Sequence, residues 1–210
     1  FFIAASALWT SAIAQLGTKK TGQGTSVVTT PYVRAELLAH APQGVAPGQP
    51  LWLGLQITHQ PEWHTYWKNP GDSGLPTELT WQLPAGLDAG DIAWPVPHKI
   101  AIGTLANYGY EGTVLLPVPV TVAQTFAPGP LAKDVTVQLK ASWLVCRKEC
   151  IPEEGNFTLQ LPIQSTTALH SAAFDAAQKA QPQPLAKASA QQQAQVDGDA
   201  TGLFFGQAVG

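Results

Sequence analysis

Apolar and polar residues alternate along most of the chain from residue 26 to residue 164. The alternation has a period of two, which is typical of half-buried β-strands because successive side chains of a strand point to opposite faces. Turn-forming segments such as residues 69–72 (NPGD) and 128–130 (PGP) separate the alternating runs, and no helical period lies between them. The pattern therefore predicts an all-β domain, an antiparallel β-sandwich, whose clearest strands lie at residues 51–57, 79–83, 114–122, 135–143 and 157–163.

The alternating run at residues 114–122 contains Pro117 and Pro119. Proline has no backbone N–H and cannot donate a hydrogen bond to a neighbouring strand. We therefore expect this run to form an edge strand or a strand that is interrupted by a bulge.

The composition changes after residue 164, where Ala and Gln become frequent and aromatic residues become rare. Residues 168–180 have the composition of a helix, and Pro182 and Pro184 would end it. We therefore expect the sandwich domain at residues 26–164 and an Ala/Gln-rich helical or linker segment at residues 165–200. Residues 201–210 are interpreted as the start of a further domain.

Residues 1–14 are mostly apolar and end in a small-residue pattern, Ala12-x-Ala14, that is typical of a signal-peptidase site. We interpret them as a partial signal peptide and residues 15–25 as a flexible lead. A truncated membrane anchor is the alternative, but Ser and Thr interrupt the apolar run, which is shorter than the roughly 20 residues that a spanning helix needs. Because the chain contains 0 Met, we expect it to be part of a longer, exported protein.

Charge is sparse along the chain. Only 12% of the 210 residues are charged, the net charge is -3, and no basic stripe is present. We therefore expect neither a nucleic-acid-binding surface nor a polybasic membrane patch. The chain is 45% hydrophobic, with 7 Trp and 7 Phe, which is enough for one sizeable core.

The chain has 2 cysteines, Cys146 and Cys150, which enclose Arg147, Lys148 and Glu149. In an exported protein such a pair is expected to form a disulfide, because the compartment is oxidising and no third thiol competes. An extended chain would hold the two Cα atoms roughly 13 Å apart, whereas a disulfide allows about 4.4–6.8 Å. The sequence therefore predicts a turn at residues 147–149.

This disulfide could be a structural staple or a redox-active pair. Closing a loop of about five residues removes only about 2 kcal/mol of unfolded-state entropy, so the staple would be weak. A bridge across a tight turn is instead of the kind that exchanges readily with other thiols. Arg147 and Lys148 would favour the reactive thiolate, and Glu149 would oppose them. The residues alone leave both interpretations open.

No metal site and no cofactor are expected. A zinc site needs three or four ligands, and none of the 5 His has a paired spacing near Cys146. The segment Gly71–Gly74 (GDSG) is similar to the nucleophile loop of chymotrypsin-like proteases, but no His and Asp in a recognisable context precede it, so we interpret it as a turn. Residues 156–158 (NFT) match a glycosylation sequon, but Phe157 lies on the core face of a predicted strand, so we assign the sequon no role.

Three segments together resemble a known family. They are Glu62–Gly74 (EWHTYWKNPGDSG), Asn107–Gly112 (NYGYEG) and Trp143–Glu153, which contains both cysteines. In this order they are similar to the periplasmic N-terminal domain of the DsbD/ScsB family of protein-disulfide reductases, and the likeness covers residues 27–164. The cysteine spacing C-x3-C is similar to that of the ScsB-type branch, whereas the DsbD branch has a wider gap.

The resemblance implies an immunoglobulin-like β-sandwich whose cysteine pair relays electrons. In this family a membrane domain takes electrons from cytoplasmic thioredoxin, a thioredoxin-like domain passes them on, and the N-terminal domain delivers them to periplasmic proteins. The implied partners are the thioredoxin-like domain of the same full-length protein and thioredoxin-fold acceptors, such as a disulfide isomerase, a peroxiredoxin-like protein or a cytochrome-maturation protein. The implied location is the periplasmic side of the inner membrane in a Gram-negative cell, with the membrane domain after the present chain.

The resemblance also implies roles for individual residues. Cys150 would form mixed disulfides with partners, and Cys146 would resolve them. A cap loop with an aromatic lid, Tyr108 or Tyr110, would shield the pair, although ordinary strand packing is the favoured explanation for either tyrosine taken alone. This cap loop would consist of Asn107, Tyr108, Gly109, Tyr110 and Glu111. Weaker candidates for support of the site are His64, Tyr66, Arg147 and Lys148.

The alternative function is an exported immunoglobulin-like binding or adhesion module in which the disulfide is purely structural. Its Trp residues would then contact a carbohydrate or a protein. A relay pair should equilibrate with a thioredoxin-like partner, whereas a buried structural bridge should have a reduction potential below about -300 mV and resist reduction.

Overall fold

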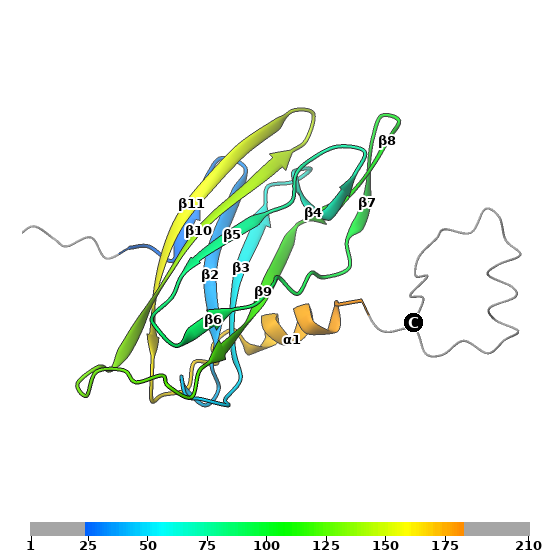
Figure 1. The fold of residues 1–210 in the computed structure, drawn as a ribbon. Coiled ribbons are helices and arrows are strands. Elements are labelled where there is room, and N and C mark those ends of the chain that lie inside the picture. Colours follow the sequence, from blue (N-terminus) through cyan, green and yellow to red (C-terminus); the bar gives the residue numbers. More distant parts are fainter. Residues whose placement is uncertain (1–23, 183–210) are drawn as a thin grey trace, which may run out of the picture.

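The computed structural model describes residues 24–182, which form two antiparallel sheets and one short helix (Figure 1). The first sheet has 5 strands, in the spatial order β1 (Val27–Thr29), β2 (Val33–His40), β3 (Leu51–His59), β9 (Thr113–Val122) and β6 (Leu87–Ala89). The second sheet has 6 strands; the order is β11 (Cys150–Pro162), β10 (Asp134–Cys146), β4 (His64–Gly71), β8 (Leu105–Glu111) and β7 (His98–Ile102), and β5 (Glu78–Gln82) also pairs with β10. The predicted immunoglobulin-like antiparallel β-sandwich is confirmed.

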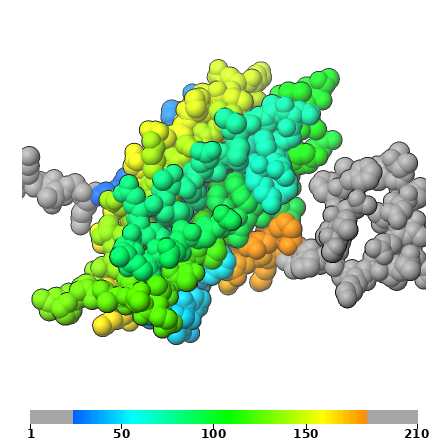
Figure 2. Space-filling model, in the orientation of Figure 1, coloured from blue at the N-terminus to red at the C-terminus, as the bar shows by residue number. Residues whose placement is uncertain are grey.

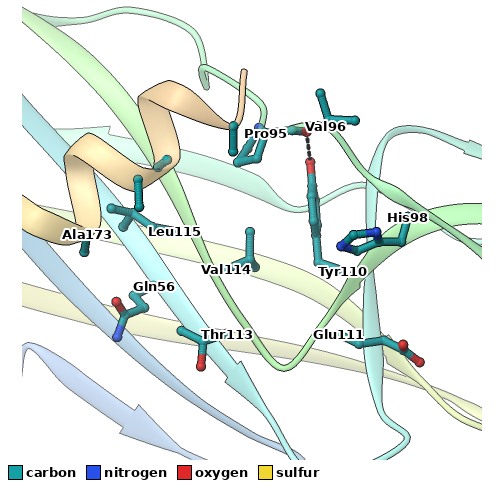
Figure 3. A pocket seen from close by; sticks show the side chains of 13 residues that line it. Gln56, Pro95, Val96, His98, Tyr110, Glu111, Thr113, Val114, Leu115 and Ala173 are labelled. Carbon is teal, nitrogen blue, oxygen red and sulfur yellow. Dashed lines mark hydrogen bonds between the residues drawn. The ribbon is translucent and has the colours of Figure 1, made fainter. Parts of the chain in front are cut away.

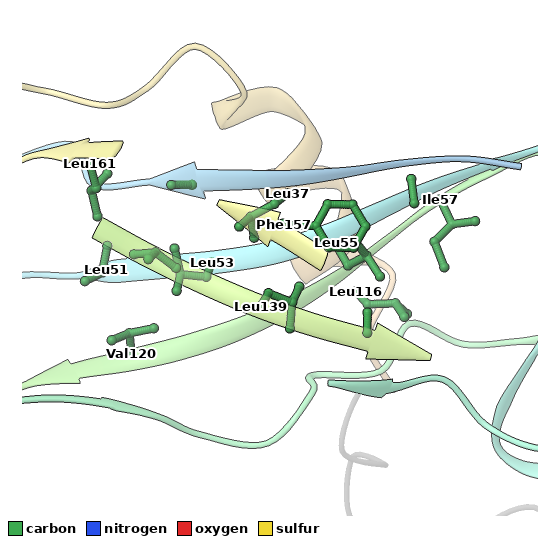
Figure 4. Packing of buried hydrophobic residues seen from close by; sticks show 14 of the residues in the cluster. Leu37, Leu51, Leu53, Leu55, Ile57, Leu116, Val120, Leu139, Phe157 and Leu161 are labelled. Atoms are coloured by element: carbon green, nitrogen blue, oxygen red, sulfur yellow. The ribbon is translucent and has the colours of Figure 1, made fainter. Parts of the chain in front are cut away.

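The period-two alternation builds the core between the sheets. Alternate residues of β10, from Val135 to Trp143, are buried, and their neighbours are more exposed. These side chains meet those of β2, β3 and β9, and Figure 4 shows the packing of Leu37, Leu53, Leu55, Leu116, Leu139, Phe157 and Leu161. Burying each such side chain contributes about 1.5–3 kcal/mol, so this contact between the sheets is the main source of stability.

The predicted strand runs coincide with observed strands. Residues 51–57, 114–122 and 135–143 lie within β3, β9 and β10, and the other two runs overlap β5 and β11. The pattern did not predict β2, which carries apolar residues on both faces because Leu38 packs against a second cluster outside the sandwich. The strands β4 and β8 were not predicted either, because their polar and turn-forming residues obscure the alternation.

The prediction that residues 114–122 form an edge or bulged strand was wrong. This run is β9, which lies between β3 and β6 and pairs with β3 in continuous register from Leu51↔Val120 to Thr58↔Thr113. The carbonyl groups of Pro117 and Pro119 accept hydrogen bonds from Ala93 N and Gly90 N. The edge of β9 on which the two prolines lack an N–H group is therefore the one that meets the irregular segment after β6. The hydrogen bonds between β9 and β3 on the other edge are unaffected.

The helix expected within residues 168–180 is α1 (Ser171–Lys179). Phe174 is fully buried and packs with Leu38, Leu115 and Ala177, so the helix covers the outer face of the first sheet. The C-terminal end of α1 is tied to the sandwich because Val96 N donates to Ala180 O.

Several expectations lie outside the described residues. They are the partial signal peptide at residues 1–14, most of the lead at residues 15–25, the linker after residue 182 and the segment 201–210. Within residues 24–182, no helix combines the length and the apolar character that crossing a bilayer requires.

Candidate functional site

The long β10–β11 hairpin brings the two cysteines together at its tip. Each strand has 13 residues, and their pairing runs without a shift from Asp134↔Pro162 to Cys146↔Cys150. Residues 147–149 form the predicted turn, in which Arg147 N donates to Glu149 O at 3.0 Å. The two cysteines form a disulfide with their Cα atoms 4.1 Å apart. The hairpin thus places the sulfurs within bonding distance through its own register.

The two cysteines differ in their access to solvent. Cys146 is buried, with 1% of its surface exposed, beside the core residues Trp143 and Val145. Cys150 lies on the exposed side of the turn. Of the two cysteines, Cys150 is therefore the more accessible from solvent.

Strand β4 places two polar aromatic side chains beside this disulfide. His64 is the register partner of Cys146, and its Nε2 lies 3.3 Å from the hydroxyl oxygen of Tyr66. The same hydroxyl lies 3.7 Å from Cys150 Sγ. The structure therefore brings together His64, Tyr66 and the cysteine pair in one contiguous polar chain.

Burial sets the protonation of this chain. Desolvation lowers the pKa of His64, although the nearby Glu111 carboxylate opposes the change, so His64 is neutral at pH 7. Desolvation raises the pKa of Tyr66, and the nearby Ser73 hydroxyl opposes that rise. Tyr66 therefore retains its hydroxyl proton at neutral pH and can donate it in a hydrogen bond.

His59, which was not a predicted site residue, lies at the corner between β3 and β4. Its Nδ1 lies 2.8 Å from Gly112 O, and its Nε2 lies 3.0 Å from Thr65 Oγ1. Because the carbonyl can only accept, Nδ1 donates and Nε2 accepts from the threonine hydroxyl, which requires a neutral ring. Burial lowers the pKa of His59 to about 4. No sequence signal distinguishes this histidine, since both of its partners come from tertiary contacts.

The charged residues of the turn interact with the segment before β4. Arg147 Nη1 lies 3.1 Å from Glu62 Oε2, and the guanidinium lies 5.6 Å from the centre of the Trp63 ring. The charge of Arg147 is therefore partly neutralised by Glu62. Lys148 and Glu149 are exposed in the turn.

Residues 107–111, which were expected to form a cap loop, lie in a strand, and their shielding of the cysteines stays a prediction. These residues belong to β8, which pairs with β4 on one side and β7 on the other, because the hairpin bends at residues 103–104 instead. Tyr110 is buried in the main core, and its hydroxyl donates to Pro95 O at 2.7 Å (Figure 3). Tyr110 thus packs as a core residue, and shielding by the half-buried Tyr108 stays a prediction.

The remaining members of this segment lie close to β4. Glu111 and Gly109 are the register partners of His64 and Tyr66. Asn107 is completely buried, and its Oδ1 accepts hydrogen bonds from Ser73 N at 2.9 Å and Ser73 Oγ at 3.0 Å. Ser73 was not predicted as a site residue, because residues 71–74 have the composition of an ordinary turn.

In the described part of the chain, no three His, Cys, Asp or Glu side chains are grouped so that they could share a metal ion. The chemistry that this arrangement offers is that of its sulfurs, because a thiolate that attacks Cys150 can break the bond to Cys146. Fold and site together define an immunoglobulin-like sandwich domain with a disulfide at the tip of its longest hairpin.

Comparison with known proteins gives the family. The sequence matches the family described as thiol:disulfide interchange protein DsbD, N-terminal, over residues 34–162. Since this match covers more than half of the chain, the chain belongs to the DsbD N-terminal domain family, as its sequence resemblance indicates. Membership supports a general role in thiol:disulfide interchange, with a redox-active disulfide.

One solved structure supports the fold. The N-terminal periplasmic domain of ScsB from Proteus mirabilis has a TM-score of 0.56 and 18% sequence identity, over 75% of this chain and 59% of that one. The present chain thus spans less than two thirds of that domain. The GAE domain of yeast GGA1 has a TM-score of 0.33 and 12% identity, over 65% of this chain and 99% of that one, and supports no conclusion. No curated protein matches the sequence.

Proposed function

We propose that the Cys146–Cys150 pair relays electrons, as a protein-disulfide reductase, from a membrane-embedded reductase module to thioredoxin-fold proteins in the periplasm. The observation that carries this proposal is the position of the disulfide. It joins one exposed and one buried cysteine at a hairpin tip, where a partner can reach Cys150 while Cys146 stays shielded from direct attack.

The reduced pair delivers two electrons in two exchange steps. The Cys150 thiolate attacks one sulfur of a partner disulfide; a bond forms between Cys150 Sγ and that sulfur, and the second partner sulfur leaves as a thiolate. The Cys146 thiolate then attacks Cys150 Sγ, which forms the domain's disulfide and releases the first partner sulfur as a thiolate. The partner thiolates take up the protons that the two thiols lost, so the domain is oxidised and the partner is reduced.

The geometry favours this role over a structural staple. The hairpin residues from Asp134↔Pro162 to Val145↔Ile151 are already paired below the disulfide, so the bond adds little to the definition of the fold. The loop that it closes is short, and the stabilisation from chain entropy is about 2 kcal/mol. The burial of Cys146 also suits a resolving thiol, because it prevents direct attack on that sulfur.

The proposed partners follow from family membership. Upstream, a thioredoxin-like domain of the same full-length protein would reduce the pair, with a membrane module as the source of electrons. Downstream, the acceptor would be a periplasmic thioredoxin-fold protein, such as a disulfide isomerase, a peroxiredoxin-like protein or a cytochrome-maturation protein. The domain would work on the periplasmic side of the inner membrane.

Trapping of the mixed disulfide tests this function. The Cys146→Ser variant, mixed with an oxidised thioredoxin-fold disulfide isomerase, should accumulate a covalent complex on non-reducing gels, because no thiol remains to resolve it. The Cys150→Ser variant is the matched control and should give little complex. Trapping through Cys146 alone would reverse the assigned roles. A wild-type disulfide that does not equilibrate with the isomerase in a redox titration would favour the structural disulfide of a binding or adhesion module.

A further inference from the structure

The segment Gly71–Gly74, which was predicted to be a turn, folds back over the ring of Tyr66. A Cβ atom at Gly74 would lie 2.3 Å from Tyr66 Cε1, and Gly74 has a φ of +99°. Any side chain at this position would therefore collide with the ring and strain the backbone. The glycine lets the segment pack directly against one side of the phenol.

Strand β8 holds this segment in place. Asp72 N donates to Ala106 O at 3.1 Å, and Ala106 N donates to Asp72 Oδ2 at 2.7 Å. The side chain of Asn107 then accepts both hydrogen bonds that Ser73 donates through its N–H and its hydroxyl. Figure 2 shows the surface of this region, where residues after β4, in cyan to teal, lie next to the β7–β8 hairpin in green. We call residues 71–74 together with Asn107 the tyrosine clamp.

The clamp fixes a hydroxyl that touches a reacting atom. Tyr66 has 0% of its surface exposed, and its hydroxyl lies between Cys150 Sγ at 3.7 Å and His64 Nε2 at 3.3 Å. The His64 and Tyr66 rings meet edge to face, with centroids 5.2 Å apart. A buried phenol in contact with one sulfur of a disulfide has no evident packing role that phenylalanine would not fill as well.

We propose that Tyr66 is a catalytic residue, whose hydroxyl donates a hydrogen bond to the Cys150 thiolate of the reduced protein, and that the tyrosine clamp positions it. This inference rests on the proposed function and deepens it. The single proton of the phenol points to sulfur when His64 carries its proton on Nε2 and donates to the phenol oxygen. The residues of the clamp act through Tyr66 and are positioning residues.

The hydrogen bond assigns the attacking role to Cys150. A bond from a neutral donor to an anion is roughly twice as strong as a neutral one, so it favours the thiolate over the thiol. The Cys150 thiolate then attacks the partner disulfide as described above, and no proton leaves Tyr66 during the step. Among the described hydrogen bonds, the Tyr66 hydroxyl contacts the sulfur of Cys150 and not that of Cys146.

The charged groups around the site do not replace this donor. On the turn, Arg147 is paired with Glu62, and Lys148 and Glu149 are adjacent charges of opposite sign. From β8, Glu111 faces His64 across the ladder. The phenol is thus the polar group in direct contact with Cys150 Sγ among the described hydrogen bonds.

The test measures the thiolate of Cys150 directly. In the full chain carrying Cys146→Ser, the rate of iodoacetamide alkylation is followed against pH, so that only Cys150 titrates. Adding Tyr66→Phe should shift the profile to higher pH and slow alkylation at pH 7 about tenfold, which corresponds to about one pKa unit. Tyr110→Phe is the matched control: it removes a buried tyrosine hydroxyl that bonds to Pro95 O, and it should leave the profile unchanged.

Clamp variants test the positioning. Gly74→Ala should reproduce the shift, whereas Gly103→Ala should not, because Gly103 also has a positive φ, +60°, but a Cβ atom added there would meet no other atom within 4 Å. Ser73→Ala should shift the profile in the same direction, and Ser73→Thr should restore it. A destabilised fold alone would not move a thiol pKa selectively.

The outcomes separate this inference from the proposed function. Superimposable alkylation profiles for the parent and Tyr66→Phe would overturn the inference, even if the mixed disulfide of the parent is trapped normally. Equal shifts for Tyr66→Phe and Tyr110→Phe would also overturn it, since the effect would then be structural. A shift confined to Tyr66→Phe and the clamp variants Gly74→Ala and Ser73→Ala supports it, whether or not a thioredoxin-fold partner exchanges with the pair.

Discussion

Reduction of the Cys146–Cys150 disulfide should cost the domain little stability. The cysteines are 4 positions apart, and the chain-entropy relation gives about 2 kcal/mol at 25 °C for a loop of that size, against about 4.7 kcal/mol for a loop of 100 residues. The paired residues of β10 and β11 remain in place, because their register continues from the tip to Asp134↔Pro162. Cys146 stays buried as a small apolar side chain.

Urea unfolding followed by Trp fluorescence, with and without a reductant, measures this difference. The reduced protein should unfold in one transition at a slightly lower midpoint. The variant with both Cys146→Ser and Cys150→Ser is the control, and its midpoint should not respond to the reductant. A loss of more than about 4 kcal/mol, or unfolding on reduction alone, would refute the reasoning and show that the disulfide is a structural staple.

Three further predictions concern residues around the core and the site. Because burial lowers the pKa of His59 from 6.5 to about 4, the unfolded chain binds more protons than the folded protein between these two pH values. The contribution of neutral His59 to the free energy of unfolding should be fully present above pH 6.5 and fall by about 3 kcal/mol on acidification to pH 4. Urea unfolding at a series of pH values measures this loss, and His59→Gln should remove it. Tyr108→Ala should speed alkylation of the reduced cysteine pair if Tyr108 shields it. Tyr110→Ala should lower the melting temperature without speeding alkylation of the native protein, since Tyr110 is a core residue. The reverse pattern would contradict the placement of Tyr110. Phe174→Ala should cost about 3–5 kcal/mol and expose α1 to hydrogen exchange, and normal protection of α1 would contradict its anchoring by this side chain.

Local sequence determined the architecture and the position of the disulfide. The alternation at residues 51–57 and 135–143 predicts β3 and β10, because a strand of a sandwich buries one face and exposes the other to solvent. The turn at residues 147–149 follows from the reach of a disulfide between the 2 cysteines, and helix α1 follows from composition and the prolines after it. Each of these conclusions depends on residues that are neighbours in sequence.

Only the tertiary structure decided the position of β9 inside its sheet. Pro117 and Pro119 break a ladder only on the side to which their N–H groups would point, and that side meets the irregular segment after β6. Residues 107–111 form a strand instead of a loop because β4 and β7 supply hydrogen-bond partners on both edges. Sequence alternation indicates which face is apolar, but it carries no information about which neighbours an edge will meet.

The environment of the cysteine pair likewise depends on long-range contacts. Tyr66 meets Cys150 across 84 positions of sequence, and Ser73 meets Asn107 across 34. Sequence resemblance brought these segments to attention, but it assigned shielding to a loop and left Gly71–Gly74 as a turn. The contacts arise from the register between β4, β8 and β10, and register is set by the packing of whole strands, which no local pattern specifies.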